Sequence, residues 1–98
     1  MLETFEKFAG KTCKLEKLKL KTSSEVKEGS KCIGEMEIFD YTLSNGKMGF
    51  DIIVGNNILN FIKTSTVKKV LKKTLRSVTF NTLTSTYKLT LVSKKKDK

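Results

Sequence analysis

The side chains of this sequence that could do chemistry are mainly lysines and aromatic rings. Lys and Arg number 20 and Asp and Glu number 10 among 98 residues, so the net charge is +10, and no residue is His. Without His, the commonest general base and the usual zinc ligand are missing, which excludes Ser-His-Asp, Cys-His and His-metal chemistry. We therefore expect a binding protein that uses no cofactor and whose partner is an anion, and we do not expect an enzyme.

The positive charge is concentrated in part of the chain. Residues 1–49 contain nine Lys and eight acids, whereas residues 50–98 contain eleven Lys or Arg and two Asp. Lysine clusters lie in residues 11–21, 63–76 and 94–98. A single lysine run is more often a solvated face than a binding site. Three clusters in one small chain favour an anion-binding surface.

Nucleic-acid binding without sequence preference needs lysines that follow the phosphates and rings on which bases stack. The sequence offers both kinds of side chain. Phe39, Tyr41 and Phe50 are predicted to share one face, which is either the core or a stacking platform, and the core is favoured. The residues predicted to contact nucleic acid are Lys14, Lys17, Lys19, Lys21, Tyr41, Lys47, Phe61, Lys63, Tyr87 and Lys88.

Two aspartates and two cysteines offer other chemistry. Asp40 and Asp51 are predicted to lie opposite each other, where paired carboxylates could bind a divalent metal or act as acid and base. No third ligand is predictable, so we expect these acids to pair with Lys14 or Lys19 instead. Cys13 and Cys32 show no CxxC spacing. They are predicted to be reduced and half-buried, as in a cytosol-like compartment, with one disulfide as the alternative.

Alternating apolar and polar residues predict strands in the first half of the chain. Residues 11–21 alternate with a break at Glu16 and Lys17, which is typical of a β-bulge. Residues 22–30 have the composition of a loop, and a second strand is expected over residues 31–44. Asn45 and Gly46 then predict a two-residue type I′ hairpin. This turn would place Leu43 opposite Met48, Tyr41 opposite Phe50, Phe39 opposite Ile52 and Asp40 opposite Asp51.

The second half of the sequence predicts one helix and a second hairpin. Val67, Val70, Leu71 and Leu75 gather on one side of a helical projection, with lysines on the other side, and residues 64–66 offer an N-cap. Residues 58–63 are expected to be a strand or an irregular segment. Strands are predicted around residues 78–80 and 87–92, with a Thr- and Ser-rich turn at 81–86 between them. Residues 1–93 would form one domain and residues 94–98 a disordered basic tail.

This order of elements matches a mainly β fold, the five-stranded Greek-key barrel called the OB-fold, with a helix between strands 3 and 4. In topology and charge the chain resembles the OB-fold single-stranded-DNA-binding proteins of bacteriophages and bacteria. It departs from the bacterial pattern because it has no Trp and because residues 94–98 are basic where that family commonly carries an acidic tail. An SH3-like or Sm-like barrel is the alternative fold.

The resemblance implies binding of single-stranded DNA in viral or bacterial replication, recombination or repair, with other replication or recombination proteins as partners. The longest apolar run is three residues, so no membrane span is expected, and a cytoplasmic location is predicted, in the host if the protein is viral. Two alternatives stay open. One is an adaptor that docks an acidic protein through its basic helix and tail, and the other is an RNA-binding barrel. A homodimer formed through edge strands is compatible with each of these functions.

Overall fold

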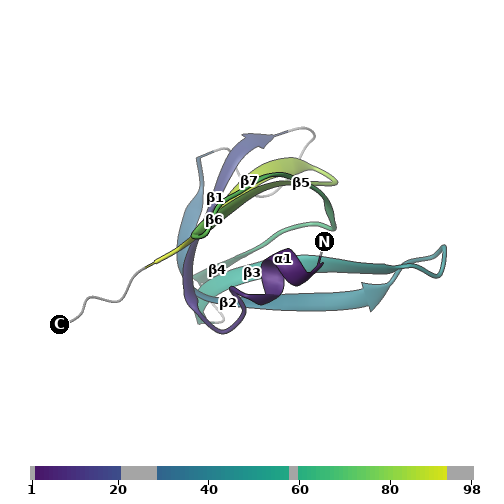
Figure 1. Ribbon diagram of the computed structural model, residues 1–98, viewed down its shortest axis with the longest axis horizontal. Coiled ribbons are helices and arrows are strands. Elements are labelled where there is room, and N and C mark those ends of the chain that lie inside the picture. The colour runs from purple at the N-terminus through teal and green to yellow at the C-terminus, as the bar shows by residue number, and fades with distance from the viewer. Residues whose placement is uncertain (1, 21–28, 58–59, 93–98) are drawn as a thin grey trace.

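The protein, described here by a computed structural model, is built almost entirely of β-strands (Figure 1). The structure describes residues 2–20, 29–57 and 60–92. Within these residues the strands form one seven-stranded antiparallel sheet in the order β4-β3-β2-β1-β7-β6-β5. The elements in chain order are α1 (Leu2–Glu6), β1 (Thr12–Leu20), β2 (Lys31–Thr42), β3 (Met48–Asn57), β4 (Asn60–Lys63), β5 (Val67–Lys73), β6 (Ser77–Thr82) and β7 (Ser85–Leu91).

The sheet curls into a partly open barrel whose two edge strands, β4 and β5, come together at the connection between them. Six antiparallel ladders separate these two edge strands, so β4 and β5 run in the same direction. Between them Thr64 N–H donates to Ile52 O of β3, and Leu83 N–H donates to Thr66 O. Together β4 and β5 therefore behave as one strand bent at residues 64–66, paired first with β3 and then with β6. Bends of this kind let one strand serve two parts of a curved sheet.

The core lies inside this curved sheet and is closed by α1, which sits within the curve in Figure 1. Alternate residues point inward along β2, β6 and β7, as half-buried strands require. The Phe5 ring of α1 packs edge-on against Phe50 of β3 at 5.4 Å and against Phe80 of β6 at 5.0 Å between ring centroids. Aromatic pairs in this geometry contribute beyond their buried area. Phe5 thus joins the two sides of the barrel.

The fold predicted from sequence, a five-stranded OB-fold with a helix between strands 3 and 4, is wrong, because residues 67–73 form strand β5. Two β-bulges explain the misleading pattern. Lys68 and Leu71 are extra residues opposite β6, so the inward-facing Val67 and Val70 lie three positions apart instead of two. This spacing imitates a helical period. A helix would also have placed lysines three and four residues apart, where like charges repel.

The register predicted for the first hairpin is shifted by one residue. The loop contains three residues, 44–46, because Leu43 N–H donates to Lys47 O and Gly46 adopts a φ of 84°. A type I turn followed by a left-handed Gly gives this arrangement, whereas the predicted type I′ turn needs positive φ at two positions. Phe39 therefore lies opposite Asp51 and Asp40 opposite Phe50. The two aspartates do not face each other.

Other predictions about the fold had mixed outcomes. A β-bulge in the first strand is confirmed, although it lies between Lys17 and Lys19, after the predicted position. Both cysteines are unpaired and buried, and burial raises the pKa of Cys13 to about 11. Residues 94–98 and most of the loop at 22–30 lie outside the described residues. None of the described helices has the length and apolar character that a membrane span needs.

Candidate nucleic-acid interface

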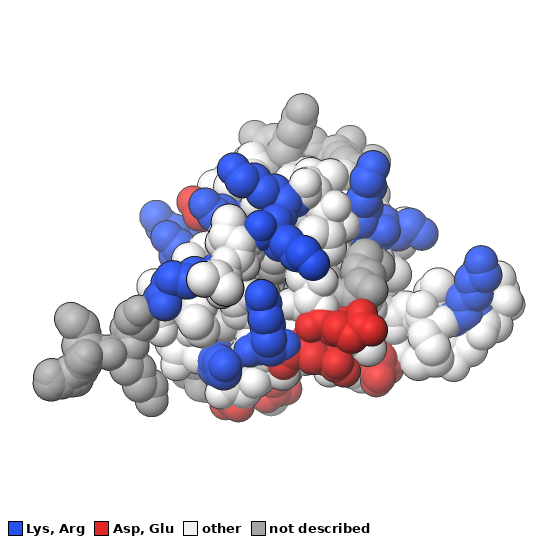
Figure 2. All heavy atoms as spheres, viewed as in Figure 1, with Lys and Arg blue, Asp and Glu red and all other residues white. Residues whose placement is uncertain are grey.

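Charge divides the barrel into two walls. The basic wall, defined as β5, β6 and β7 (residues 67–91), contains six Lys or Arg and no acid. The mixed-charge wall, defined as β2, β3 and β4 (residues 31–63), contains four acids and three Lys. Figure 2 shows mainly blue side chains in the upper half of the molecule, where β5–β7 lie, and a group of red ones below, where α1, β2 and β3 lie. The net charge is therefore +6 on the basic wall and −1 on the mixed-charge wall, which favours anions on the first, although Lys88 at its border lies opposite Glu16 of β1.

The strand register places two lysines in one row on the outer face of the basic wall, with a threonine between them. Lys72 of β5 lies opposite Thr79 of β6, which lies opposite Lys88 of β7. In the next row, Lys69 lies opposite Asn81. Thr79 and Asn81 alternate along β6 with the buried Val78 and Phe80, and Lys88 lies between buried residues of β7, so these side chains face outward. Lys69 and Lys72 pair with Asn81 and Thr79 and share their face. Lys72 and Lys88 are two strand spacings apart, about 10 Å.

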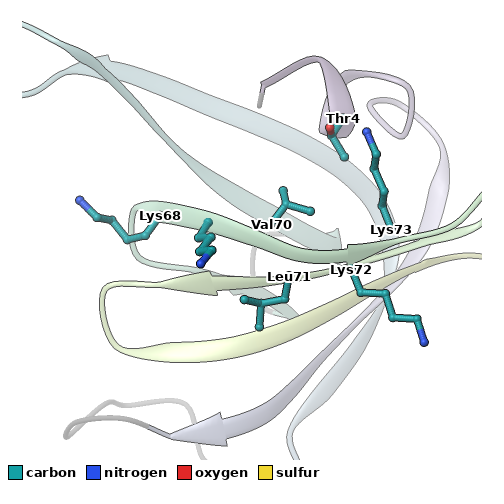
Figure 3. Close-up of a pocket in the computed structure, with 7 residues that line it drawn as sticks. Thr4, Lys68, Val70, Leu71, Lys72 and Lys73 are labelled. Carbon is teal, nitrogen blue, oxygen red and sulfur yellow. The ribbon is translucent and has the colours of Figure 1, made fainter.

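Strand β5 carries lysines on both of its sides because of its two bulges. Lys69 and Lys72 lie opposite outward residues of β6, whereas Lys73 lies opposite the buried Val78. Figure 3 shows Lys73 directed toward Thr4 of α1 and Lys72 directed away from it. A groove of about 560 Å³ follows β5 and is lined by Thr4 and by the six residues from Lys68 to Lys73. The cations thus extend from the outer face to the open edge of the barrel.

The basic wall suits contact with phosphates and not the stacking of bases. Its two aromatic residues, Phe80 and Tyr87, lie in the core and stack on each other at 5.8 Å between centroids. Across residues 67–91, all of which the structure describes, no ring is exposed. Lysine, threonine and asparagine side chains can donate hydrogen bonds to phosphate oxygens without reading the bases.

The lysines predicted to bind nucleic acid do not form one surface. Lys88 is exposed on the basic wall, and Lys14 of β1 lies opposite Thr90 of β7, on the same outer face. Lys47 is exposed in the loop between β2 and β3, on the other wall. Lys17 is fully buried, with Nζ 5.9 Å from the centroid of the Tyr87 ring, because the bulge follows it and leaves it in phase with Cys13 and Leu15. Lys21 and the side chain of Lys19 lie outside the described residues.

The predicted stacking residues are also divided between core and surface. Tyr87 is 1% exposed, so its ring has no free face for a base. Phe61 is exposed on β4, and Phe39, favoured as core, is exposed on β2 because the hairpin register is shifted. Phe50 is buried. The exposed rings lie on the mixed-charge wall near Glu35 and Glu37, which are exposed and would repel phosphate.

Tyr41 and Lys63 are engaged with Asp51 on the mixed-charge wall. The Tyr41 hydroxyl donates a hydrogen bond to Asp51 Oδ1 and shares a second, of 2.6 Å, with Thr66 Oγ1. Burial, and then the hydrogen bond to Asp51, raise the pKa of Tyr41. Lys63 Nζ lies 3.5 Å from Asp51 Oδ2 and 4.8 Å from the centroid of the Phe39 ring. These contacts fix the bend at residues 64–66 to the first hairpin.

Asp51 therefore pairs with Lys63, and not with Lys14 as predicted from the sequence, whereas the side chain of Lys19, the other predicted partner, lies outside the described residues. The described residues contain no group of three or more His, Cys, Asp or Glu side chains that could hold a metal ion. Lys69 and Lys72 were predicted as the back of a helix. Their position on the same outer face as Lys88 depends on β-strand pairing that no local sequence signal specifies.

Comparison of the chain with protein-family models, with curated proteins and with solved structures found no match.

Proposed function

We propose that the protein binds nucleic acid through phosphate contacts on its basic wall. The proposal rests on the composition of residues 67–91, which contain six Lys or Arg and no acid. It rests also on the outward row formed by Lys72, Thr79 and Lys88. Lysines that neutralise phosphates release condensed counterions, which makes binding favourable and dependent on salt. The groove beside β5 extends this surface by Lys68 and Lys73.

Single-stranded DNA is the first ligand to test, with RNA as the alternative, and the proposed setting is replication, recombination or repair. The structure supports backbone contact more than base stacking, because the exposed Phe39 and Phe61 lie on the mixed-charge wall. We therefore propose modest discrimination between single strands and duplex. The two free thiols fit a cytoplasmic location, in the host if the protein is viral.

The test is fluorescence anisotropy with single-stranded DNA, duplex DNA and RNA of equal length across a salt series. We expect the logarithm of the association constant to fall linearly with the logarithm of salt concentration, with a slope near −0.7 to −0.9 per phosphate contacted. Reversal of Lys69, Lys72 and Lys88 to Glu should weaken binding to every ligand and reduce this slope by about 2 to 3.

The matched control reverses three exposed lysines outside the basic wall, Lys7, Lys11 and Lys47, to Glu. Both variants change the net charge equally, so only the position of the charge differs. Equal losses in the two variants would show that total charge, and not the basic wall, governs binding. Absence of binding by the unmodified protein at low salt would reject the proposal.

An acidic protein docked on a basic helix is not proposed, because residues 67–73 form a strand.

A further inference from the structure

Strand β3 is longer than the strand that pairs with its outer edge. β4 covers Ile53–Asn57 of β3, and within the described chain no strand covers Met48–Asp51 on that side. These residues belong to the hairpin of β2 and β3, which extends beyond the rest of the barrel at the right of Figure 1. A two-stranded ribbon is only marginally stable by itself in water, and a third strand stabilises it.

The backbone of this segment points its hydrogen-bonding groups at the uncovered side. Ile52 O accepts from Thr64 N–H, and Ile52 N–H donates to Thr64 Oγ1, so the backbone groups of Ile52 face away from β2. Backbone direction alternates along a strand, so the N–H and C=O groups of Phe50 and Met48 point the same way. None of the described residues pairs with them. They form a short free strand edge.

A cavity of about 290 Å³ lies along this edge. Met48, Gly49 and Phe50 line one side, and Thr66, Val67 and Lys68 line the other. The lining also includes Lys47, and none of its residues, all within the described chain, is acidic. The cavity therefore combines an apolar base, free backbone groups and a basic rim.

The strand edges on the two sides of this cavity, β3 and β5, differ in how well they are protected against pairing with another strand. β5 has two bulges and four exposed lysines, features that discourage pairing with another strand. The Met48–Asp51 segment of β3 has no bulge, no proline and no lysine, and Met48 is 64% exposed. An incoming strand would pair with β3, with the lysines of β5 lying along its other side.

We propose that the free edge of β3 binds an extended acidic segment of a partner protein as an added antiparallel or parallel strand. The main-chain groups of Met48 and Phe50 supply the hydrogen bonds, as in other cases of strand addition. Alternate side chains of the segment face inward, where apolar residues contact Met48 and Val67. The remaining side chains are acidic and lie near Lys47 and Lys68. This site shares Val67 and Lys68 with the basic wall but does not use its outward lysines Lys69, Lys72 and Lys88, and it does not depend on nucleic-acid binding.

The probe is a fluorescein-labelled peptide of alternating Val and Asp, about eight residues long to match a typical strand. A peptide with Lys in place of Asp tests the charge requirement. Met48→Pro tests the backbone requirement, because Pro removes the outward N–H yet is tolerated at the start of an edge strand. Met48→Thr is the matched control, since it changes the same side chain and keeps the N–H.

We expect the Val-Asp peptide to bind and the Val-Lys peptide not to bind. Met48→Pro should weaken binding about tenfold, the loss expected for one hydrogen bond left unmade, and Met48→Thr by less than about twofold. Hydrogen exchange should slow at the Met48 and Phe50 amides on binding and stay unchanged at Gly49 and Asp51. Lys69, Lys72 and Lys88 reversed to Glu should leave this pattern of amide protection in place.

Equal affinity of the Pro and Thr variants, or no protection of the Met48 and Phe50 amides, would overturn the proposal. A dimer that forms without peptide and protects the same amides would also overturn it, because the edge would then pair with a second copy. Circular dichroism of both variants verifies that the barrel is folded.

Discussion

The two walls of the barrel place the same kinds of residue in opposite positions. On the basic wall the lysines face solvent and the rings of Phe80 and Tyr87 lie inside. On the mixed-charge wall Phe39 and Phe61 face solvent, and the cation of Lys63 is engaged by Asp51. A protein that binds single strands by stacking needs cations and rings on one surface. Their separation shows that composition alone does not define a stacking site.

The largest expected effect on stability comes from removing the Phe5 ring, which packs between the two walls. Phe5→Ala should destabilise the protein by about 3–5 kcal/mol, because the fully buried ring contacts Phe50 on one wall and Phe80 on the other. Urea unfolding followed by circular dichroism measures this change. Leu75→Ala is the control, since Leu75 is 89% exposed and its loss should change stability little. Similar losses in both variants would contradict the role given to Phe5.

A smaller effect is expected from Asp51→Asn on the mixed-charge wall. The substitution removes the charge that Lys63 pairs with and weakens the hydrogen bond from Tyr41. We expect a loss of about 1–3 kcal/mol in the free energy of unfolding. The same variant releases Lys63 from its ion pair, so nucleic-acid affinity should stay constant or rise slightly. A fall in affinity in a variant that remains folded would mean that the mixed-charge wall contributes to binding.

The contribution of the Tyr41 hydroxyl to the free energy of unfolding should depend on pH. Its pKa is raised in the folded state by burial and by Asp51, so the folded protein holds the phenol proton more tightly than the unfolded chain. Stability from this source is present below the ordinary tyrosine pKa near 10 and is lost as the pH rises through the raised value.

Tyr41→Phe should therefore make the free energy of unfolding fall less steeply above about pH 10. Tyr87 and Cys13 also have raised pKa values because they are buried, so part of the alkaline loss should remain in this variant. Urea titrations at a series of alkaline pH values measure both slopes. Identical slopes in the variant and the unmodified protein would mean that the hydroxyl environment differs from the one described.

The smallest effect is expected from the exposed rings. Phe39→Ala combined with Phe61→Ala should change the affinity for single-stranded DNA by less than about twofold if binding uses only the basic wall. Stacking at these rings would instead contribute about 1–3 kcal/mol per base. Anisotropy titrations at one salt concentration decide between these outcomes. A large loss restricted to single strands would show that the ligand reaches the mixed-charge wall.

Local sequence patterns predicted several strands and the position of the first hairpin. The bulged first strand, the turn near Asn45 and the final hairpin all occur close to their predicted places. Strand β5 was not predictable because its bulges give apolar residues a helical spacing. The exposure of Phe39 depends on whether the loop has two or three residues, and one residue of register moves every side chain to the other face.

The candidate interface could be predicted only in part. Charge in the second half of the chain indicated an anion-binding region that includes Lys88, and the exposure of Lys88 follows from simple alternation. The burial of Lys17 and Tyr87 requires the position of the first bulge and the pairing of β1 with β7. The row from Lys72 to Lys88 requires three strands in register. Such long-range pairing is a property of the assembled sheet.

The pairing of β1 with β7 also determines when the protein can fold during synthesis. Cys13 lies opposite Leu91, and Val92 N–H donates to Thr12 O. The central strand β1 therefore cannot complete its pairing until β7, near the end of the described chain, has been synthesised. Until residues 85–91 leave the ribosome, one edge of β1 stays open to other nascent chains. Contacts between such distant residues slow folding, and the exposed edge favours aggregation in the meantime.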